Sequence, residues 1–588
     1  MIKKIPYGLT DYEKFVTGHY YYVDKTRYLS SIEKAGDYLF FIRPRRFGKS
    51  LFLSTMETYY DVAKADQFDL FYKNTDIHQQ PTEERNKYLI LKFNFSALEP
   101  HYEKIEASFL NNVQTIVKSF LHKYAAYLTS QAREELRSQL DDMTSAADIL
   151  LRVINICKDS DRKIYIIIDE YDNFANTILS TSGSGDYRSL THGEGFFRAF
   201  FNVLKDSTTG SGAPTARLFI TGVSPITLDD VTSGFNIGKN ISTVPAFNNM
   251  LGFTGAEVTE IIDYYQERGV LHHPSDDLLE IMGTWYNHYN FSKDQKETLF
   301  NPDMVLYFLD QYIQNNGIPD DLIDRNVRID YGKLRHLIMI DRDGITRANG
   351  NFSQLKEIVK EQEILQSKIV KGFPLEELQE SGNFISLLFY FGLLTIDGVE
   401  RDKLRLAIPN ETVKRLFYEY IEKGYRDTGV FSLDLTRYRE LMSDMAYEGK
   451  WRPLFEYICS RLHESMGLRD LMSGEKSIQA FLNVYLGLSD LYIVHPEKEL
   501  NKGYADLLLE PFLVVYDGIR YTYLLEIKYM KKSEDRQERL QQLKLEAENQ
   551  LKAYSLDSKL QKSLGRTTLI KLVLIFSGPQ LKYLAQVT

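Results

Sequence analysis

The loop between residues 43 and 50 carries residue types that bind phosphates. A strand-like apolar run, Tyr38–Ile42, leads into it, and an amphipathic helix pattern, Leu51–Tyr60, follows it. Loops of the form G-x-x-x-x-G-K-[ST] occur in this context, because glycines let backbone N–H groups curl around phosphates at a helix N-terminus. The end of this loop fits the pattern, whereas an arginine replaces the first glycine. The candidate nucleotide-binding residues are Arg43, Pro44, Arg45, Arg46, Phe47, Gly48, Lys49 and Ser50.

Two side chains of this loop have distinct expected roles. The Lys49 ammonium would meet the β- and γ-phosphates of ATP, and the Ser50 hydroxyl would ligate Mg²⁺. The alternative is that a Gly-Lys-Ser tripeptide marks only the start of a helix. A second motif is needed to decide between the two.

That second motif is the apolar run Lys163–Glu170, a buried-strand pattern that ends in two carboxylates. Asp169 is expected to hold Mg²⁺ through water, and Glu170 to polarise the attacking water as a catalytic residue. Acidic residues after a strand also serve as surface caps, and Asp172 fits that description. The two motifs together predict a site for ATP and Mg²⁺.

Three charged residues near the C-terminus predict a different chemistry. Asp506 lies in the strand-like run Gly503–Glu510, and the run Tyr521–Lys528 ends in Glu526 and Lys528. Alternation along a strand puts the glutamate and the lysine on one face, and a hairpin can bring Asp506 beside them. Carboxylates bind Mg²⁺, the metal activates water, and a lysine orients that water or neutralises charge. The alternative is an ordinary cross-strand ion pair on a solvated face.

A basic cluster follows this group. Lys531 and Lys532 continue from Lys528, and Arg536 and Arg539 lie on the next helical pattern. These cations would suit a phosphate backbone. A solvated helix start explains them equally well.

The pattern of apolar residues predicts the strands and helices that position these side chains. Continuous apolar runs alternate with helical patterns, which predicts a parallel sheet with helices on both faces. These runs are Tyr38–Ile42, Tyr88–Phe95, Ile164–Ile168 and Leu218–Thr221. Residues 180–193, rich in Ser, Thr and Gly, are predicted to form a mobile surface loop. Further on, Phe384–Ile396 and Leu404–Ile408 suggest a hairpin turning at Asp397-Gly398.

Composition sets the class of protein. The chain has 588 residues, which is more than one hydrophobic core usually supports, so we expect at least three domains. Hydrophobic residues make up 43% of the chain and charged residues 26%, which is an ordinary globular composition. Two cysteines, Cys157 and Cys459, favour a reducing compartment rather than disulfides. No apolar window is long enough for a membrane span, so we expect a cytoplasmic protein without membrane contact. The net charge of −10 argues against indiscriminate coating of nucleic acid.

Several segments together resemble a known family. They are Tyr21–Thr26, Arg43–Ser50, Ile168–Asp172, Thr221–Pro225 and Asn301-Pro302. They are similar to bacterial AAA-ATPase-like proteins abundant in gut anaerobes, and the resemblance covers nearly the whole chain. In that family the first glycine of the loop is commonly replaced, as it is by Arg43. The resemblance also implies that Thr221, at the end of a strand, is a polar γ-phosphate sensor.

The C-terminal group resembles the PD-(D/E)XK nuclease superfamily, with the first motif reduced to Asp506. The superfamily core of helix, three strands, helix and strand matches the order of patterns here. Many members place a glutamine on the later helix, which implies a supporting role for Gln550, one turn before Tyr554. Glu475 is the candidate for an added acid.

The expected fold is α/β throughout, with five regions. They are a P-loop AAA-like domain (1–252), a helical lid (253–330), a winged-helix-like middle (331–430), a helical linker (431–470) and a PD-(D/E)XK nuclease-like domain (471–588).

The leading hypothesis is an ATP-regulated, Mg²⁺-dependent nuclease that acts on DNA, with defence against mobile elements as the role by analogy. ATP is either hydrolysed or only bound. One alternative is a nucleotide-dependent switch or assembly protein whose nuclease-like domain only binds nucleic acid. Another is an ATP-dependent remodeller of protein partners. The sequence allows a homo-oligomer.

Overall fold

The computed structural model separates into two compact units. Residues 1–340 with 364–410 form the N-terminal unit, and residues 341–363 with 411–588 form the C-terminal unit. The structure describes residues 1–587 except 97, 100, 174–194, 210–211, 227–237, 329–350, 375–376, 379, 428–430 and 465–473. The loop predicted at 180–193 lies outside the described residues.

A parallel sheet organises the N-terminal unit. Its strands pair in the order β2-β3-β4-β1-β5, with bounds β1 Tyr38–Ile42, β2 Leu89–Asn94, β3 Ile164–Asp169, β4 Thr215–Gly222 and β5 Lys239–Asn240. Each pairing is parallel. The expected parallel α/β sheet is confirmed, and it places the strands of both phosphate-site motifs on either side of β4.

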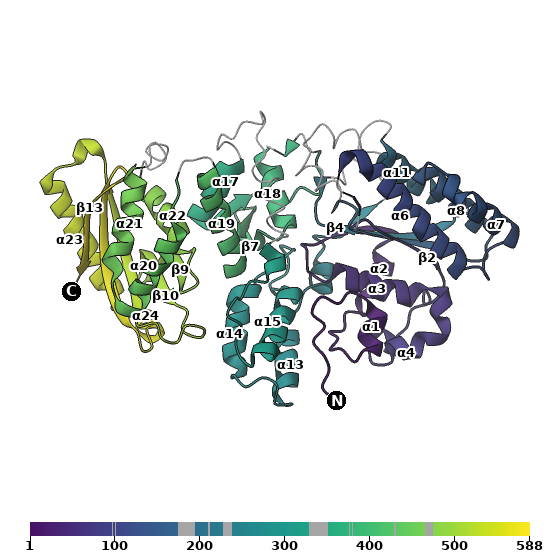
Figure 1. Cartoon of the computed structure of the whole chain (residues 1–588), viewed down its shortest axis with the longest axis horizontal. Coiled ribbons are helices and arrows are strands. Elements are labelled where there is room, and N and C mark those ends of the chain that lie inside the picture. Colours follow the sequence, from purple (N-terminus) through teal and green to yellow (C-terminus); the bar gives the residue numbers. More distant parts are fainter. Residues whose placement is uncertain are drawn as a thin grey trace. The chain divides into compact units, whose positions relative to one another are not determined.

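Helices cover both faces of this sheet (Figure 1). One face carries α6 (Tyr102–Lys123), α8 (Ala146–Lys158) and α11 (Phe196–Ser207), and the other carries α2 (Tyr28–Ala35) and α3 (Lys49–Tyr60). Because both faces are covered, every residue of β3 is buried. Smaller helices complete the layers: α1 (Tyr12–Thr17), α4 (Phe68–Tyr72), α5 (Asp76–Gln79) and α7 (Ser130–Gln139).

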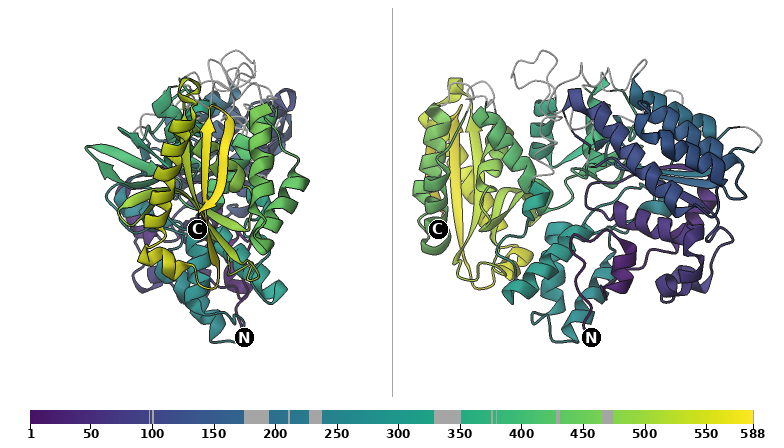
Figure 2. Two further views of the ribbon diagram at one scale, coloured as in Figure 1. Left: turned by 90° about the vertical axis from the view of Figure 1, so that its left-hand side faces the viewer. Right: turned by 45° about the vertical axis from the view of Figure 1, so that its right-hand side comes forward.

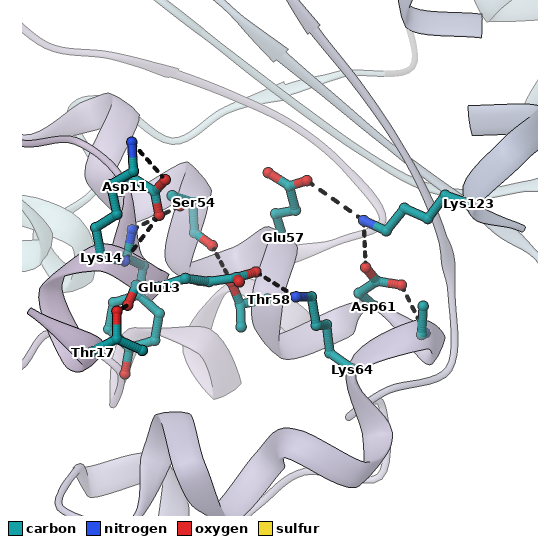
Figure 3. A network of polar contacts seen from close by, with 12 residues as sticks. Asp11, Glu13, Lys14, Thr17, Ser54, Glu57, Thr58, Asp61, Lys64 and Lys123 are labelled. Carbon is teal, nitrogen blue, oxygen red and sulfur yellow. Dashed lines mark hydrogen bonds and ion pairs between the residues drawn. The ribbon is translucent and has the colours of Figure 1, made fainter. Parts of the chain in front are cut away.

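The helix that follows the phosphate loop, α3, is fixed along its length. Tyr59 and Tyr60 near its end are fully buried, and the hydroxyl of buried Tyr72 donates to the Thr55 carbonyl at 2.8 Å. At the C-terminal end, Lys123 reaches between Glu57 and Asp61, at 3.9 and 2.6 Å (Figure 3). A rigid helix holds the loop at its N-terminus in one position.

Helices and a small sheet form the rest of this unit. The helices are α13 (Gly255–Gln266), α14 (Ser275–Tyr286), α15 (Pro302–Asn315) and α18 (Ser381–Tyr390), and the strands are β6 (Glu363–Gln366), β7 (Thr395–Glu400) and β8 (Lys403–Ala407).

The expected hairpin is wrong in two details. Residues 381–390 form helix α18, buried on all sides beyond its first turn, and such an apolar run does not reveal its period. The turn lies at Arg401-Asp402, where both residues have positive φ, and Asp397-Gly398 lies within β7 at an irregularity. The winged-helix assignment of 331–430 stays a prediction.

A five-stranded sheet organises the C-terminal unit. Its order is β13-β12-β11-β10-β9, with β11 and β12 parallel and the other pairs antiparallel. The bounds are β9 Tyr492–Leu500, β10 Gly503–Pro511, β11 Tyr521–Met530, β12 Thr568–Ser577 and β13 Gln580–Val587. Leu524 and Val573 face a core completed by Leu543, Ala547 and Leu551 of α23 (Gln537–Tyr554).

Helices also cover the second face of this sheet (Figure 2). The segment predicted as a helical linker supplies α20 (Leu435–Glu448) and α21 (Trp451–Glu464), which pack against β11 and β13. Tyr523 on β11 donates its hydroxyl to the Met445 carbonyl at 2.7 Å. The remaining helices are α17 (Asn351–Glu361), α19 (Glu411–Asp427), α22 (Glu475–Leu486) and α24 (Ser558–Ser563).

No helix in the described part of the chain is both long and apolar enough to cross a lipid bilayer.

Candidate functional site

The loop between β1 and α3 brings the two motifs of the candidate nucleotide site together. Gly48, directly before α3, is in the left-handed region with φ 89°. The Ser50 hydroxyl donates to the Asp169 carboxylate at 2.7 Å, so the ends of the two motifs meet. The Lys49 ammonium donates to the carbonyls of Arg43 and Pro44 at 3.0 and 2.8 Å. The lysine therefore lies inside the curve of its own loop.

Burial and nearby acids compete at Lys49. Burial lowers the pKa of its ammonium, while Glu170, Asp169 and Asp172 oppose this shift. A buried cation in a ring of carbonyls and carboxylates is poorly solvated, so it gains from an anionic ligand. A phosphate would have to take the ammonium from the two loop carbonyls.

Arg43 is anchored away from the loop, which explains how a side chain replaces the first glycine. Its guanidinium is buried and donates to the carbonyls of Ser242 at 2.6 Å and Phe247 at 3.0 Å. It stacks between Phe41 and Phe291, 4.3 and 4.1 Å from the ring centres. Its φ is not positive, so the backbone requires no glycine here. Burial lowers its pKa to about 9, and it stays charged at neutral pH.

We expect Arg43→Ala to destabilise the N-terminal unit by about 3–5 kcal/mol, because buried carbonyls lose their donors and two rings lose a partner. Urea unfolding followed by fluorescence measures this. Arg27→Ala, which removes an exposed arginine, is the control and should change stability by less than about 0.5 kcal/mol. Equal midpoints for the two variants would contradict the anchoring role.

Two buried oxygen atoms near the ends of β3 and β4 have no partners among the described residues. Asp169 Oδ1 and the Thr221 hydroxyl are buried and have no hydrogen bond among the described residues. Burial raises the pKa of Glu170, with Lys49 opposing this shift. Orphaned oxygens beside a hydroxyl suit a hard cation and a phosphate oxygen. The residues present therefore fit Mg²⁺ and ATP.

Asp172 is not a surface cap. It is buried, and its carboxylate accepts from the backbone N–H groups of Val223 at 3.1 Å and of Ser224. This carboxylate joins the chain after β3 to the chain after β4. Its role is to fix the edge of the sheet at which the phosphate-site residues lie.

A cavity of about 580 Å³ opens beside this loop. Its lining includes Gly48, Lys49 and Glu170 and the apolar residues Phe253 and Leu306. A cavity lined by both charged and apolar residues can hold a ligand with phosphates and a flat ring. The volume is ample for a nucleotide.

The three C-terminal charged residues converge on β10 and β11. Glu526 Oε1 accepts from the Lys528 ammonium at 2.8 Å, and Asp506 Oδ2 accepts from the Ile527 backbone N–H at 2.6 Å. Glu526 and Lys528 are buried. Glu526 Oε2 is also buried and has no partner within the described part of the chain. A solvated surface ion pair, the alternative from sequence, does not describe this group.

Two regions of the chain match known protein families. Residues 6–232 match the family described as "Predicted AAA-ATPase", and residues 473–585 match the PD-(D/E)XK nuclease superfamily. The chain joins an AAA-ATPase-like domain to a PD-(D/E)XK domain. A protein of Azotobacter chroococcum mcd 1, described as an uncharacterized protein in the vnfD 5′ region, is 26% identical over 436 residues, 72% of this chain and 70% of that protein. The resemblance to both families is confirmed.

Carboxylates in the PD-(D/E)XK domain are hard to ionise together. The pKa of Asp506 is raised to about 8 by burial and then by the Glu526 carboxylate. Burial also raises the pKa of Glu526, with Lys528 opposing this shift. Burial alone would lower the pKa of Lys528, but the acids outweigh it and raise this pKa. An added cation would relieve the repulsion between the two carboxylates.

In EDTA near pH 8.5, the melting temperature of Asp506→Asn should lie about 3 °C or more above that of the wild type. Near pH 5, the two proteins should have the same melting temperature. A carboxyl whose pKa is raised on folding contributes stability that is fully present below its unfolded pKa, near 4. This stability is lost as the pH rises through about 8. Differential scanning fluorimetry across pH measures the gap between the variants. A gap that does not change with pH would contradict this account.

The predicted accessory residues of the PD-(D/E)XK domain lie near the same group. Burial raises the pKa of Glu475, on α22, and Lys528 opposes this shift, so the two interact. Burial and then the Glu526 carboxylate raise the pKa of Tyr554 on α23, and a hydrogen bond with Gln550 opposes this shift. Gln550 Oε1 is buried without a partner among the described residues.

Gln479 is a residue that the sequence prediction missed. It is buried on α22 and donates to the Asp506 carbonyl at 2.8 Å. Its only sequence signal is the spacing of four from Glu475, which puts both on one face of the helix. The helix thus supports the backbone at Asp506.

The basic residues beside the PD-(D/E)XK site are exposed. Lys531, Lys532 and Arg536 are all accessible to solvent, and Arg539 donates to Gln542 at 2.8 Å. Their exposure fits both a solvated surface and a contact with phosphates.

Proposed function

We propose that this protein is an ATP-regulated, Mg²⁺-dependent nuclease that acts on DNA. The observation that carries the proposal is the group of partly buried Asp506 and buried Glu526 and Lys528, with one oxygen of Glu526 left without a partner among the described residues. Burying two acids is costly unless a cation accompanies them. Phosphodiester cleavage requires such a cation beside a lysine.

The chain's own residues divide the nuclease work. Asp506 and Glu526 would hold Mg²⁺, which supplies water activation and charge neutralisation. Lys528 orients the attacking water or neutralises charge on the phosphorus oxygens. Gln479 and the Ile527 N–H keep Asp506 in place. The exposed cations Lys531, Lys532 and Arg536, together with Arg539, would position the DNA backbone.

The nucleotide site has a separate set of proposed roles. Lys49 binds the phosphates of ATP, and Ser50 and Asp169 would hold its Mg²⁺. Glu170 polarises the attacking water, and the unpartnered Thr221 hydroxyl contacts the γ-phosphate. The remaining loop residues, from Arg43 to Gly48, complete the cradle.

The test incubates the purified protein with supercoiled plasmid and Mg²⁺, with and without ATP. We expect nicked or linear DNA, with a rate that changes when ATP is present. Absence of cleavage under every condition would contradict the nuclease. ATP turnover without nucleic-acid binding would instead favour a remodeller of protein partners.

One observation favours a second candidate, a switch whose PD-(D/E)XK domain binds nucleic acid without cleaving it. Among the described residues, no group of three or more His, Cys, Asp or Glu side chains is arranged to hold a metal. A metal at the Asp506 and Glu526 site would have only these two carboxylates as side-chain ligands, and its other ligands would be backbone groups or water. Equal affinity for DNA in EDTA and in Mg²⁺, together with the absence of cleavage, would support this candidate.

A further inference from the structure

The phosphate loop contains an arginine, Arg46, that is ion-paired to two acids far along the chain, Asp303 and Asp324. Arg46 Nη1 lies 2.9 Å from Asp303 Oδ2 and 3.5 Å from Asp324 Oδ2. Arg46 has a φ of 65°, a conformation that costs a non-glycine residue about 1 kcal/mol or more. The loop accepts this conformation in a geometry that places the guanidinium against the two acids.

Both acids are held in place by their own elements. Asp303 lies in the first turn of α15, whose N-cap Asn301 accepts from the Asp303 N–H at 3.1 Å. Asp324 is buried, and its carboxylate accepts hydrogen bonds from the Tyr7 hydroxyl at 2.5 Å and from the Asn326 backbone N–H at 2.8 Å. The Asn301-Pro302 segment, noted in the sequence without a role, therefore begins the helix that presents Asp303.

Arg46 and Asp303 line the same cavity as Lys49. The carboxylates of Glu170 and Asp303 line that cavity together with the cations Arg45 and Lys49. An arginine that is ion-paired to Asp303 and Asp324 must leave these carboxylates before it can bind a phosphate. An incoming triphosphate and Asp303 would repel each other and compete for the same guanidinium. Arginine is suited to this exchange, because its donors fit carboxylate and phosphate alike.

We propose that Arg46 is a phosphate-binding residue that Asp303 and Asp324 hold in competition with the nucleotide. Binding of ATP draws the guanidinium from the carboxylates, and this exchange frees the N-terminus of α15 from the phosphate loop. The inference rests on the proposed nucleotide site and adds to it a link between that site and α15.

Opposite effects of two substitutions distinguish competition from support. If Arg46 and Asp303 only hold the fold together, removing either one should weaken nucleotide binding. If they compete with the nucleotide, Arg46→Ala should weaken binding and Asp303→Asn should strengthen it. Alanine and arginine bear the same cost at positive φ, so Arg46→Ala changes only the side chain. Asp324→Asn gives a second acid variant.

The measurement is equilibrium binding of a fluorescent ATP analogue and of its ADP counterpart to the full chain. Arg46→Ala should raise the Kd for the ATP analogue about 10- to 100-fold, and the ADP analogue less. Asp303→Asn should lower the Kd for the ATP analogue about 3- to 10-fold. Asp324→Asn should act in the same direction as Asp303→Asn.

Matched controls separate these effects from general loss of charge. Asp276 occupies the same position in the first turn of α14 as Asp303 in α15 and is exposed, so Asp276→Asn removes an equal helix-terminal charge. Arg268→Ala removes an arginine that stacks on Tyr264, outside the cavity lining. Both should leave the Kd within about twofold.

Two results would overturn the inference. Weaker binding in both Arg46→Ala and Asp303→Asn would show structural support, and unchanged binding in both would show that the pair is irrelevant to the nucleotide. A wild-type protein that binds neither analogue would overturn the nucleotide site itself, so the failure of the proposed function is distinct from failure of the exchange.

Discussion

Replacing Glu526 by Gln is expected to lower the rate of Mg²⁺-dependent plasmid cleavage by about 10²- to 10³-fold or more. The substitution preserves shape and the acceptor for Lys528, and removes the charge that a cation needs. Glu526 Oε2, buried and without a partner among the described residues, would become an amide or remain a neutral oxygen. Initial rates on supercoiled plasmid measure the effect.

Two further variants make this result interpretable. Glu499→Gln removes an exposed glutamate from strand β9 of the same sheet and should cleave like the wild type. Lys528→Met should also be slow, because the lysine is paired with Glu526 at 2.8 Å. Cleavage by Glu526→Gln within about threefold of the wild type would place the active site elsewhere, or in a contaminant.

The sequence predicted those parts of the fold whose signals are local. Buried strands such as Ile164–Asp169 are continuous apolar runs, because helices cover both faces of the sheet and both faces of the strand must therefore be apolar. The apolar run at 384–396 misled because its first part, up to Tyr390, belongs to helix α18 and is buried on all sides, so it shows neither a helical nor a strand period. The hairpin turn was misplaced because Asp-Gly is a strong turn signal, whereas the actual turn uses Arg401-Asp402.

Residues that act through backbone partners far along the chain left little signal. Gln479 donates to the carbonyl of Asp506, and any residue type at position 506 would offer that carbonyl. Arg43 likewise binds the carbonyls of Ser242 and Phe247. A sequence motif records the side chains that do chemistry, but not the acceptors that hold them. The sequence therefore shows that Arg43 replaces a glycine, but not which carbonyls anchor its side chain.

Replacing Lys49 by Ala is expected to raise the Kd for ATP about 100-fold, because a charge-assisted bond to phosphate contributes about 1.5–3 kcal/mol. Lys49 is buried and already inside the loop, bonded to the carbonyls of Arg43 and Pro44. ATP exchanges those neutral acceptors for charged ones, which strengthens each bond. Binding of a fluorescent ATP analogue measures the affinity.

The same substitution tests the coupling between the two domains. If ATP regulates cleavage, Lys49→Ala should cleave DNA at the rate of the wild type without ATP, and added ATP should not change that rate. Lys49→Met, which keeps the bulk of the side chain, should behave alike, and Lys34→Ala, which removes an exposed lysine at the end of α2, should behave as wild type. A Lys49→Ala protein whose cleavage still responds to ATP would show that regulation does not pass through this loop. The cost of Lys49→Ala thus falls on affinity and on regulation, whereas that of Glu526→Gln falls on the chemistry, and the two losses report on separate sites of one chain.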